Sequence, residues 1–313
     1  MKKLFAGVAA PVAEELTAGA FLGPWRLMAI DGFEWDAPDT PENAAAFGFA
    51  GTAADDPGRP AYPKVRVVTV SECASHAVAD AAMGAVAGKG AGEQSLAREL
   101  YRRLEDDWLL IADRNFFNWA DWCTAADTGA QLLWRVKADL TLPALALLPD
   151  GSYSSVLVNP KIRGKARKAV LEAARGGQDL DEDQARYVRV VEYEVPDRDG
   201  DSKGEVIALV TTITAMTAAA APMLAEAYHQ RWEHETGNAQ LKTSLRGPGK
   251  VLRSKSPDMV RQEIYGYLLT HYALSALICR AATEAGIDPD RVKFKRTVRI
   301  VRRRAADPAA FPP

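Results

Sequence analysis

Four polar side chains of different chemistry recur at regular intervals in one segment: Tyr228, Arg231, Glu235 and Lys242. We expect this segment, from about 217 to 245, to be a single helix. At 3.6 residues per turn, the four positions then fall within an arc of roughly 60°. A carboxylate on such a stripe could bind a metal ion, and the cations and phenol beside it suit phosphate groups. A solvated helix with ordinary charge pairs would explain the stripe as well.

Two apolar runs that read as buried strands each end in an aspartate. WRLMAID ends at Asp31 and WLLIAD ends at Asp113. A carboxylate is costly to bury, so an acid in this position usually lies at an exposed edge or at a functional site. With Glu235, the two aspartates are hard ligands that could hold two Mg²⁺ ions, or Mn²⁺, about 4 Å apart for phosphoryl transfer on nucleic acid. Each acid taken alone fits a solvated surface position equally well.

Positive charge is concentrated in three tracts late in the chain, although the 313 residues carry a formal net charge of only −2. The tracts are 161–168, 242–255 and 291–304. Such tracts favour a local surface for a polyanion, and a solvated face explains any single tract. In the second tract we expect Arg246, Lys250 and Arg253 to bind such a polyanion in addition to Lys242.

The elements that must position these residues alternate between strand and helix. Apolar runs predict strands at 25–31, 64–70, 76–83, 108–113 and 130–136, and helices at 93–104 and 116–126. This order predicts an α/β fold, a ribonuclease-H-like catalytic core with Asp31 and Asp113 on neighbouring strand ends. The segment 37–48 is expected to be a loop because it contains three turn-forming residues.

Turn signals and strand-like runs predict an inserted β-rich subdomain at 139–213. The expected organisation has an N-terminal helical lead-in at 1–24, a core formed by 25–138 and 214–285, and a basic C-terminal tail at 286–313. Ser256 is expected to cap a long helix within the second part of the core. Apolar residues make up 48% of the sequence, which is enough for a sizeable core.

Several short motifs strengthen this interpretation, and together they extend over most of the chain. They are AIDG (29–32), PDTPENAAAFG (38–48), ADRNF (112–116), LPDGSY (148–153), the Tyr228–Lys242 signature and VRQEIYGYLL (260–269). In these motifs the chain resembles the bacterial DDE transposases of insertion-sequence family four. The spacing of the three acids, with a β insertion in the second interval, resembles the same family.

The resemblance implies a magnesium-dependent DNA transposase that moves a transposable element by cut-and-paste DNA recombination. Asp31, Asp113 and Glu235 would bind the metal ions and carry the catalysis, while Arg231, Lys242 and Tyr228 would grip phosphates of the transposon ends. Water would nick the DNA, and the freed 3′-hydroxyl would attack the other strand or the target. The implied partners are transposon ends, target DNA and a second copy in a synaptic homodimer, in the bacterial cytoplasm at the nucleoid.

The chain begins close to Asp31, so we expect it to lack the helical domain with which family members read transposon ends. Two alternatives therefore stay open. One is a truncated transposase remnant that binds DNA or an intact transposase without transposing, and the other is a ribonuclease-H-like nuclease without strand transfer. A zinc-protease pattern begins at His234-Glu235 and fails because position 238 is Asn.

The remaining titratable residues indicate no further site. His76 and His271 are expected to be packed or surface histidines, and the three cysteines have no metal-binding spacing, which favours buried thiols in a reducing compartment. No apolar run is long enough for a membrane span, so no membrane partner is expected. The start of the chain resembles a short signal peptide, but Pro11 and the following acids favour an amphipathic helix.

Overall fold

The computed structural model describes residues 1–51, 60–137, 140, 142–195, 205–247 and 251–305. The chain folds into two compact units, each built from separate stretches of sequence. Unit 1 comprises 1–21, 28–100 and 232–313, and unit 2 comprises 22–27 and 101–231. Strand β2 (Trp25–Asp36) belongs to both, since the division falls between Leu27 and Met28.

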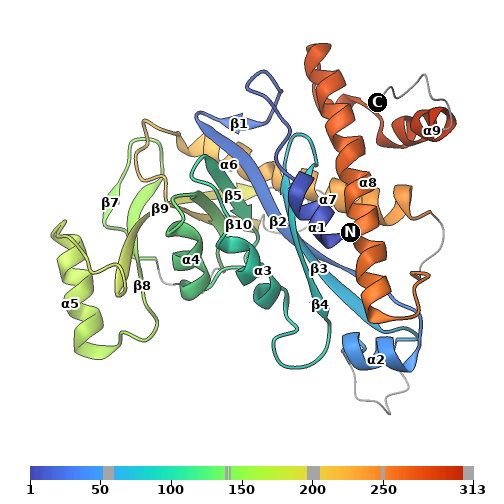
Figure 1. The fold of residues 1–313 in the computed structure, drawn as a ribbon. Helices are drawn as coiled ribbons and strands as arrows, with labels where there is room; N and C mark the ends of the chain where they lie inside the picture. Colours follow the sequence, from blue (N-terminus) through green and yellow to red (C-terminus); the bar gives the residue numbers. More distant parts are fainter. Residues whose placement is uncertain (52–59, 138–139, 141, 196–204, 248–250, 306–313) are drawn as a thin grey trace. The chain divides into compact units, whose positions relative to one another are not determined.

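Unit 1 contains an antiparallel sheet in which β3 lies between β2 and β4 (Figure 1). The strands β3 (Lys64–Glu72) and β4 (Val78–Ala85) are the two strands expected at 64–70 and 76–83. The first is rich in valine, which suits a pleated and largely buried surface. The unit's other elements are α1 (Lys2–Val8), α2 (Pro41–Phe47), α7 (Arg231–Ala239), η1 (Gln240–Leu245), α8 (Pro257–Glu284), η2 (Pro289–Arg291) and α9 (Phe294–Arg304), with α3 (Glu93–Tyr101) and β1 (Phe21–Leu22) ending at the division.

Helix α8 is the long helix predicted after Ser256, and Pro257 occupies its first turn, where a missing N–H costs nothing. Its buried face recurs at helical spacing and joins the same apolar core as Phe33 and Trp35 of β2. The segment that we described only as a basic tail contains the helix α9. Phe294 and Val298 of α9 are buried, whereas its arginines at 296, 299 and 302–304 are exposed. The fold therefore presents one face of α9 as a row of cations.

Residues 41–47 form helix α2, so the expectation of a loop over 37–48 was wrong. Thr40 caps the helix by accepting a hydrogen bond from the Asn43 N–H, and Pro41 stands at the first helical position. Proline breaks a helix from within and favours its first turn. A proline that we interpreted as breaking regular structure therefore marks the start of a helix.

Unit 2 contains a mixed sheet in the order β5-β6-β10-β9-β8-β7. Strands β5 (Trp108–Ala112) and β6 (Gln131–Arg135) are parallel and joined through α4 (Trp119–Ala126), as the sequence predicted. The later pairs are antiparallel and consist of β7 (Ala146–Leu147), β8 (Tyr153–Val158), β9 (Ala185–Val195) and β10 (Glu205–Thr211). The α6 helix (Ala221–His229) also lies in this unit.

The segment predicted as a β-rich insertion also contains a helix, α5 (Gly164–Arg175), where the sequence indicated only a basic tract. Its strand β10 pairs with β6, so the strands of the segment continue the same sheet. The boundary expected at 138–139 lies outside the described residues. The division into core and insertion stays a prediction.

A buried ion pair fixes the middle of unit 2. Arg189 on β9 is fully buried, and its guanidinium pairs with the Asp150 carboxylate, while Nε donates to Ser152 Oγ over 2.8 Å. Asp150 also accepts the Ala221 N–H at the start of α6 over 2.8 Å. One carboxylate thus connects the sheet to the first turn of α6.

The helix expected over 217–245 is not continuous. It consists of α6, a turn at Gln230, α7, and a π-helical segment η1 (Gln240–Leu245). The Thr243 hydroxyl donates to the Ala239 carbonyl over 2.6 Å within this stretch. A π segment changes the angular position of every later residue, and such segments are frequent at functional sites.

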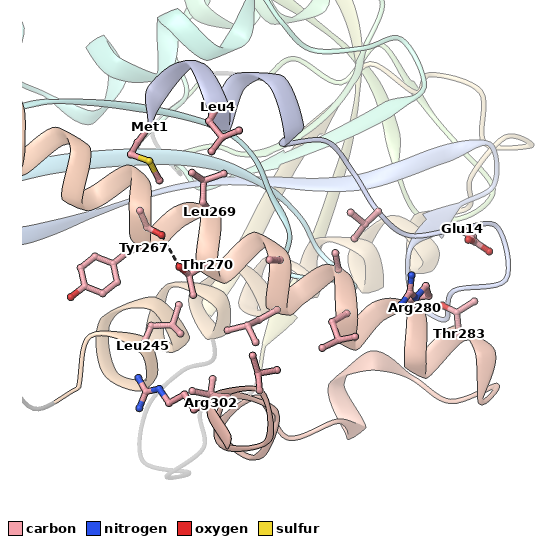
Figure 2. Close-up of a pocket in the computed structure, with 18 residues that line it drawn as sticks. Met1, Leu4, Glu14, Leu245, Tyr267, Leu269, Thr270, Arg280, Thr283 and Arg302 are labelled. Carbon is pink, nitrogen blue, oxygen red and sulfur yellow. Dashed lines mark hydrogen bonds between the residues drawn. The ribbon is translucent and has the colours of Figure 1, made fainter. Parts of the chain in front are cut away.

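A mainly apolar cavity of about 1020 Å³ runs along α8, with side chains from α1 and α9 among those lining it (Figure 2). Cys73 and Cys279 are buried thiols, as expected, and Cys123 is half-buried. Among the described residues, each helix is too short or too polar to traverse a lipid bilayer.

Candidate catalytic site

Asp31 lies within β2 and does not end it, because the strand continues to Asp36. The expectation that the strand stops at Asp31 was wrong. Phe33 and Trp35 alternate as buried residues beyond Gly32 and pair with β3, which extends the strand. Asp31 is half-buried and stands opposite Thr69 in the register.

A chain of polar side chains leads from β3 to the Asp31 carboxylate. The Thr69 hydroxyl lies 3.2 Å from His234 Nε2, and His234 Nδ1 lies 3.2 Å from the Asn238 amide nitrogen. That nitrogen lies 3.5 Å from Asp31 Oδ2. His234 and Asn238 are both buried and four residues apart on α7, so they share one helix face. These side-chain contacts fix the orientation of the Asp31 carboxylate relative to α7.

Glu235 lies on the same helix and is half-buried. It lines a cavity of about 380 Å³ together with Asp31, Gly32, Asn238 and Lys242. The structure therefore brings together two of the three predicted acids, and one predicted cation, from positions far apart in sequence. A Cβ atom at Gly32 would approach Glu93 Oε1 to 2.6 Å, so the side chain of Glu93 packs directly against this glycine.

Lys242 lies in η1 with its ammonium 5.3 Å from the centre of the Phe33 ring. Burial lowers the pKa of Lys242, and the charges of Asp31 and Glu34 oppose that shift. Desolvation by the Phe33 ring and the surrounding helix strengthens any contact of this cation with an anion. Lys242 is therefore placed to attract a phosphate beside the two carboxylates.

The other predicted residues lie in unit 2. Asp113 directly follows β5 and is half-buried, and its Oδ1 accepts the Arg114 N–H over 2.7 Å. Tyr228 is only 4% exposed, and the Arg231 guanidinium lies 5.9 Å from the centre of its ring. Burial raises the pKa of Tyr228 to about 12, with opposing effects from Arg231 and from Asp113. Asp113 thus shares the electrostatic surroundings of Tyr228 and Arg231.

The remaining predicted DNA contacts differ in their settings. The Arg246 guanidinium lies 5.9 Å from the centre of the Trp35 ring, and the backbone N–H of Arg253 donates to Glu263 over 3.1 Å, while its side chain is exposed. Lys250 lies outside the described residues. A DNA contact by each of the three stays a prediction.

Two residues of this site were not identified from the sequence. His234 and Asn238 stood out only as the two ends of a zinc pattern that fails, although they connect Asp31 to β3. Their spacing of four on one helix was the available signal, but their partner Thr69 lies on a distant strand.

The carboxylates fit a hard divalent cation, because Asp31 and Glu235 offer charged oxygens at one open cavity. The sequence model of the transposase DDE domain matches residues 24–272, which include all three predicted acids. The chain belongs to the transposase DDE-domain family. The helices and the mixed sheet confirm the predicted α/β fold class, and membership agrees with the resemblance to DDE transposases. The ribonuclease-H-like character of the core stays a prediction. The family is metal-dependent.

One similar protein is the transposase InsG for insertion sequence element IS4 of Escherichia coli K12, at 28% identity over 281 residues. The alignment covers 88% of this chain and 58% of InsG, so the chain spans less than two thirds of that relative's length. Among solved structures, a piggyBac transposase synaptic complex with hairpin DNA aligns with a TM-score of 0.42 and 11% identity. That alignment covers 90% of this chain and 54% of the other.

Proposed function

We propose that this chain is the catalytic core of an insertion-sequence transposase that cleaves DNA and joins its ends to a target. The observation that carries the proposal is the shared cavity of Asp31, Glu235 and Lys242 in a member of the DDE-domain family. Two carboxylates and a half-buried ammonium at one opening suit a metal-assisted reaction on a phosphodiester. Asp113 completes the proposed set of metal ligands.

The bound cations, two Mg²⁺ or Mn²⁺ ions in this proposal, would activate the attacking hydroxyl and neutralise charge on the scissile phosphate. Asp31, Asp113 and Glu235 would hold these ions. Asn238 orients the Asp31 carboxylate. Lys242 and Arg231 would each attract a phosphate of the DNA, with Tyr228 packed against Arg231.

The rest of the DNA path follows the exposed cations. Arg246 and Arg253 lie on the chain after Lys242, and α9 adds exposed arginines. Nucleic acid bound through such contacts depends strongly on salt, since each neutralised phosphate releases counterions. We propose transposon ends and target DNA as partners, bound by a homodimer at the bacterial nucleoid.

The test is Mg²⁺-dependent or Mn²⁺-dependent cleavage of a labelled DNA duplex, followed by joining to a target plasmid. Glu235→Gln removes a metal ligand at almost constant volume, and we expect nicking to fall at least about a thousandfold, the scale on which a catalytic unit fails when one member is lost. Glu226→Gln, on the exposed side of α6, is the matched control and should retain activity.

Nicking that persists in Glu235→Gln would contradict the assignment. Nicking without any joined product would favour a nuclease over a transposase, and DNA binding with neither product would favour a remnant. Joined product that disappears with Glu235→Gln supports the proposal.

A further inference from the structure

A second group of possible metal ligands lies where α7 meets the turn between β3 and β4. It consists of His76 in this turn, Glu233 on α7 and Asp290 in η2. His76 Nε2 lies 3.0 Å from Glu233 Oε2 and 3.3 Å from Asp290 Oδ1, and one ligand atom from each residue lies within 4.8 Å of the other two. Three segments far apart in sequence thus converge on one point.

The spacing of these atoms fits a small ion between them. Ligands about 2.1 Å from a tetrahedral Zn²⁺ lie roughly 3.4 Å from one another. An imidazole nitrogen with two carboxylate oxygens is a ligand set for Zn²⁺ and its transition-metal neighbours, whereas Mg²⁺ and Ca²⁺ prefer oxygen alone. The two carboxylates also supply the charge that a divalent cation needs.

The other nitrogen of the His76 ring is held from behind. The side-chain amide of Gln240 lies 3.1 Å from His76 Nδ1, and the same amide lies 3.1 Å from Nε2 of the buried His271. Burial lowers the pKa of His271 to about 3, so this ring is neutral. Metal-bound histidines almost always donate the N–H of their second nitrogen to an acceptor, which sets the ring orientation. Ion binding at His76 Nε2 therefore requires the Gln240 amide to be turned, so that its oxygen accepts from Nδ1 and its nitrogen donates to the neutral His271 ring.

Solvent reaches the group from one side. The side chains of His76, Glu233 and Asp290 are 8%, 28% and 38% exposed, and they border a cavity of about 280 Å³. Ser75, Thr236 and Lys293 also line this cavity. An ion can enter, and water can fill the coordination positions that the protein leaves open.

We propose that His76, Glu233 and Asp290 bind one divalent transition-metal ion of the Zn²⁺ class, at a site separate from the cavity of Asp31 and Glu235. Glu233 stands two residues before Glu235 on α7. The bound ion therefore ties the helix that carries Glu235 to the β3–β4 turn and to η2. In the competing arrangement, His76 carries a proton in place of the ion. Burial alone would lower the pKa of His76, but hydrogen bonds with Asp290 and Glu233 outweigh burial and raise the pKa to about 9.

The full chain, freed of metal with a chelator, is titrated with Co²⁺, whose visible absorption reports four- or five-coordinate sites. We expect a saturable band in the unmodified protein, displaced by Zn²⁺. His76→Gln should abolish the band, and Asp290→Asn should weaken Co²⁺ binding at least about tenfold. Asp290 is half-exposed in a surface turn, so Asp290→Asn tests the ligand without removing a core residue.

Two controls separate this site from the catalytic carboxylates. Asp31→Asn changes the other cavity, and His229→Gln removes an exposed histidine from α6, so both should retain the band. In thermal unfolding, Zn²⁺ should raise the melting temperature of Asp31→Asn and leave the melting temperature of His76→Gln unchanged. The proposal is overturned if no band forms at millimolar Co²⁺, if the band persists in both His76→Gln and Asp290→Asn, or if only Asp31→Asn removes it.

Discussion

Asn238 is the residue through which α7 controls the Asp31 carboxylate. Its amide nitrogen lies between His234 Nδ1 and Asp31 Oδ2, at 3.2 and 3.5 Å. Outer partners of this kind orient a ligand and change metal affinity by about 10–100-fold. We expect Asn238→Ala to weaken Mn²⁺ binding by at least about tenfold, measured by titration without DNA. Glu226→Gln, on the exposed side of α6, should leave the affinity unchanged, and an equal loss in both variants would contradict the positioning role.

Lys242 offers a second test on the scale of one side chain. If its half-buried ammonium contacts a phosphate, Lys242→Ala should reduce DNA affinity and lower the slope of log K against log salt by about one. The measurement is a salt series of binding isotherms on one duplex. Lys89→Ala removes an exposed lysine and controls for net charge. An unchanged slope in Lys242→Ala would rule out the phosphate contact.

Residue types were the part of the site that the sequence could supply. Asp31 stood out because it follows an apolar run, where a carboxylate is costly to bury. Glu235 and Lys242 stood out because their spacing puts a carboxylate and a cation on one predicted helix. His234, Asn238 and His76 did not stand out, since their partners come from β3, η1 and η2. A contact between distant segments leaves no local pattern in a single sequence.

On the scale of elements, the segment that carries the signature is less regular than its spacing predicts. Gln230 interrupts it between Tyr228 and Arg231, and η1 interrupts it before Lys242. Neither glycine nor proline marks these positions, so local propensity does not reveal them. The angular stripe was therefore derived from a helix that the chain does not form, although Glu235 and Lys242 still line one cavity.

Other elements show which sequence signals are strong. Apolar runs identified β3, β5 and β6, because burial on both faces needs continuous apolar residues. The helices α2 and α5 were missed. The first is short and begins with a proline that was interpreted as a breaker, and the second is highly charged with one buried residue, Ala174, and was interpreted only as a basic tract.

The ion pair between Asp150 and Arg189 gives the prediction for stability. Asp150→Asn leaves the guanidinium of a fully buried arginine without its counter-charge, and breaking such a pair costs about 3–5 kcal/mol. We expect the free energy of unfolding at pH 7, measured with urea, to fall by this amount. Asp179→Asn, at an exposed position in the same unit, should cost less than about 0.5 kcal/mol.

The same ion pair predicts how the difference in unfolding free energy between the unmodified protein and Asp150→Asn changes with pH. Burial alone would raise the pKa of Asp150, but hydrogen bonds from Ser152 and Ala221 and the charge of Arg189 outweigh it and lower the pKa. A lowered carboxyl pKa stabilises the fold above the ordinary value of about 3.9, and this contribution is lost as the pH falls through the folded-state pKa. The unmodified protein and Asp150→Asn should therefore converge in stability only below about pH 4. A difference that stays constant to pH 2 would contradict this role.

On the scale of the whole molecule, the candidate residues divide between the two units. Asp31, Glu235, Asn238 and Lys242 belong to unit 1, while Asp113, Tyr228 and Arg231 belong to unit 2. The chain passes between the two units within β1, within β2, within α3 and after Arg231. The proposed catalytic set therefore draws its residues from both units.

This proposed set predicts a specific pattern of activity. Residues that act as a unit are strongly non-additive, because removing one already abolishes the function. We expect Asp31→Asn and Asp113→Asn each to reduce metal-dependent nicking at least about a thousandfold, and the double variant to be no worse than either. Asp107→Asn, exposed at the opposite end of β5, is the control for Asp113 and should retain activity. If Asp113→Asn kept its nicking rate, or if the two losses multiplied, Asp113 would not share a metal pair with Asp31, and the catalytic set would be confined to unit 1.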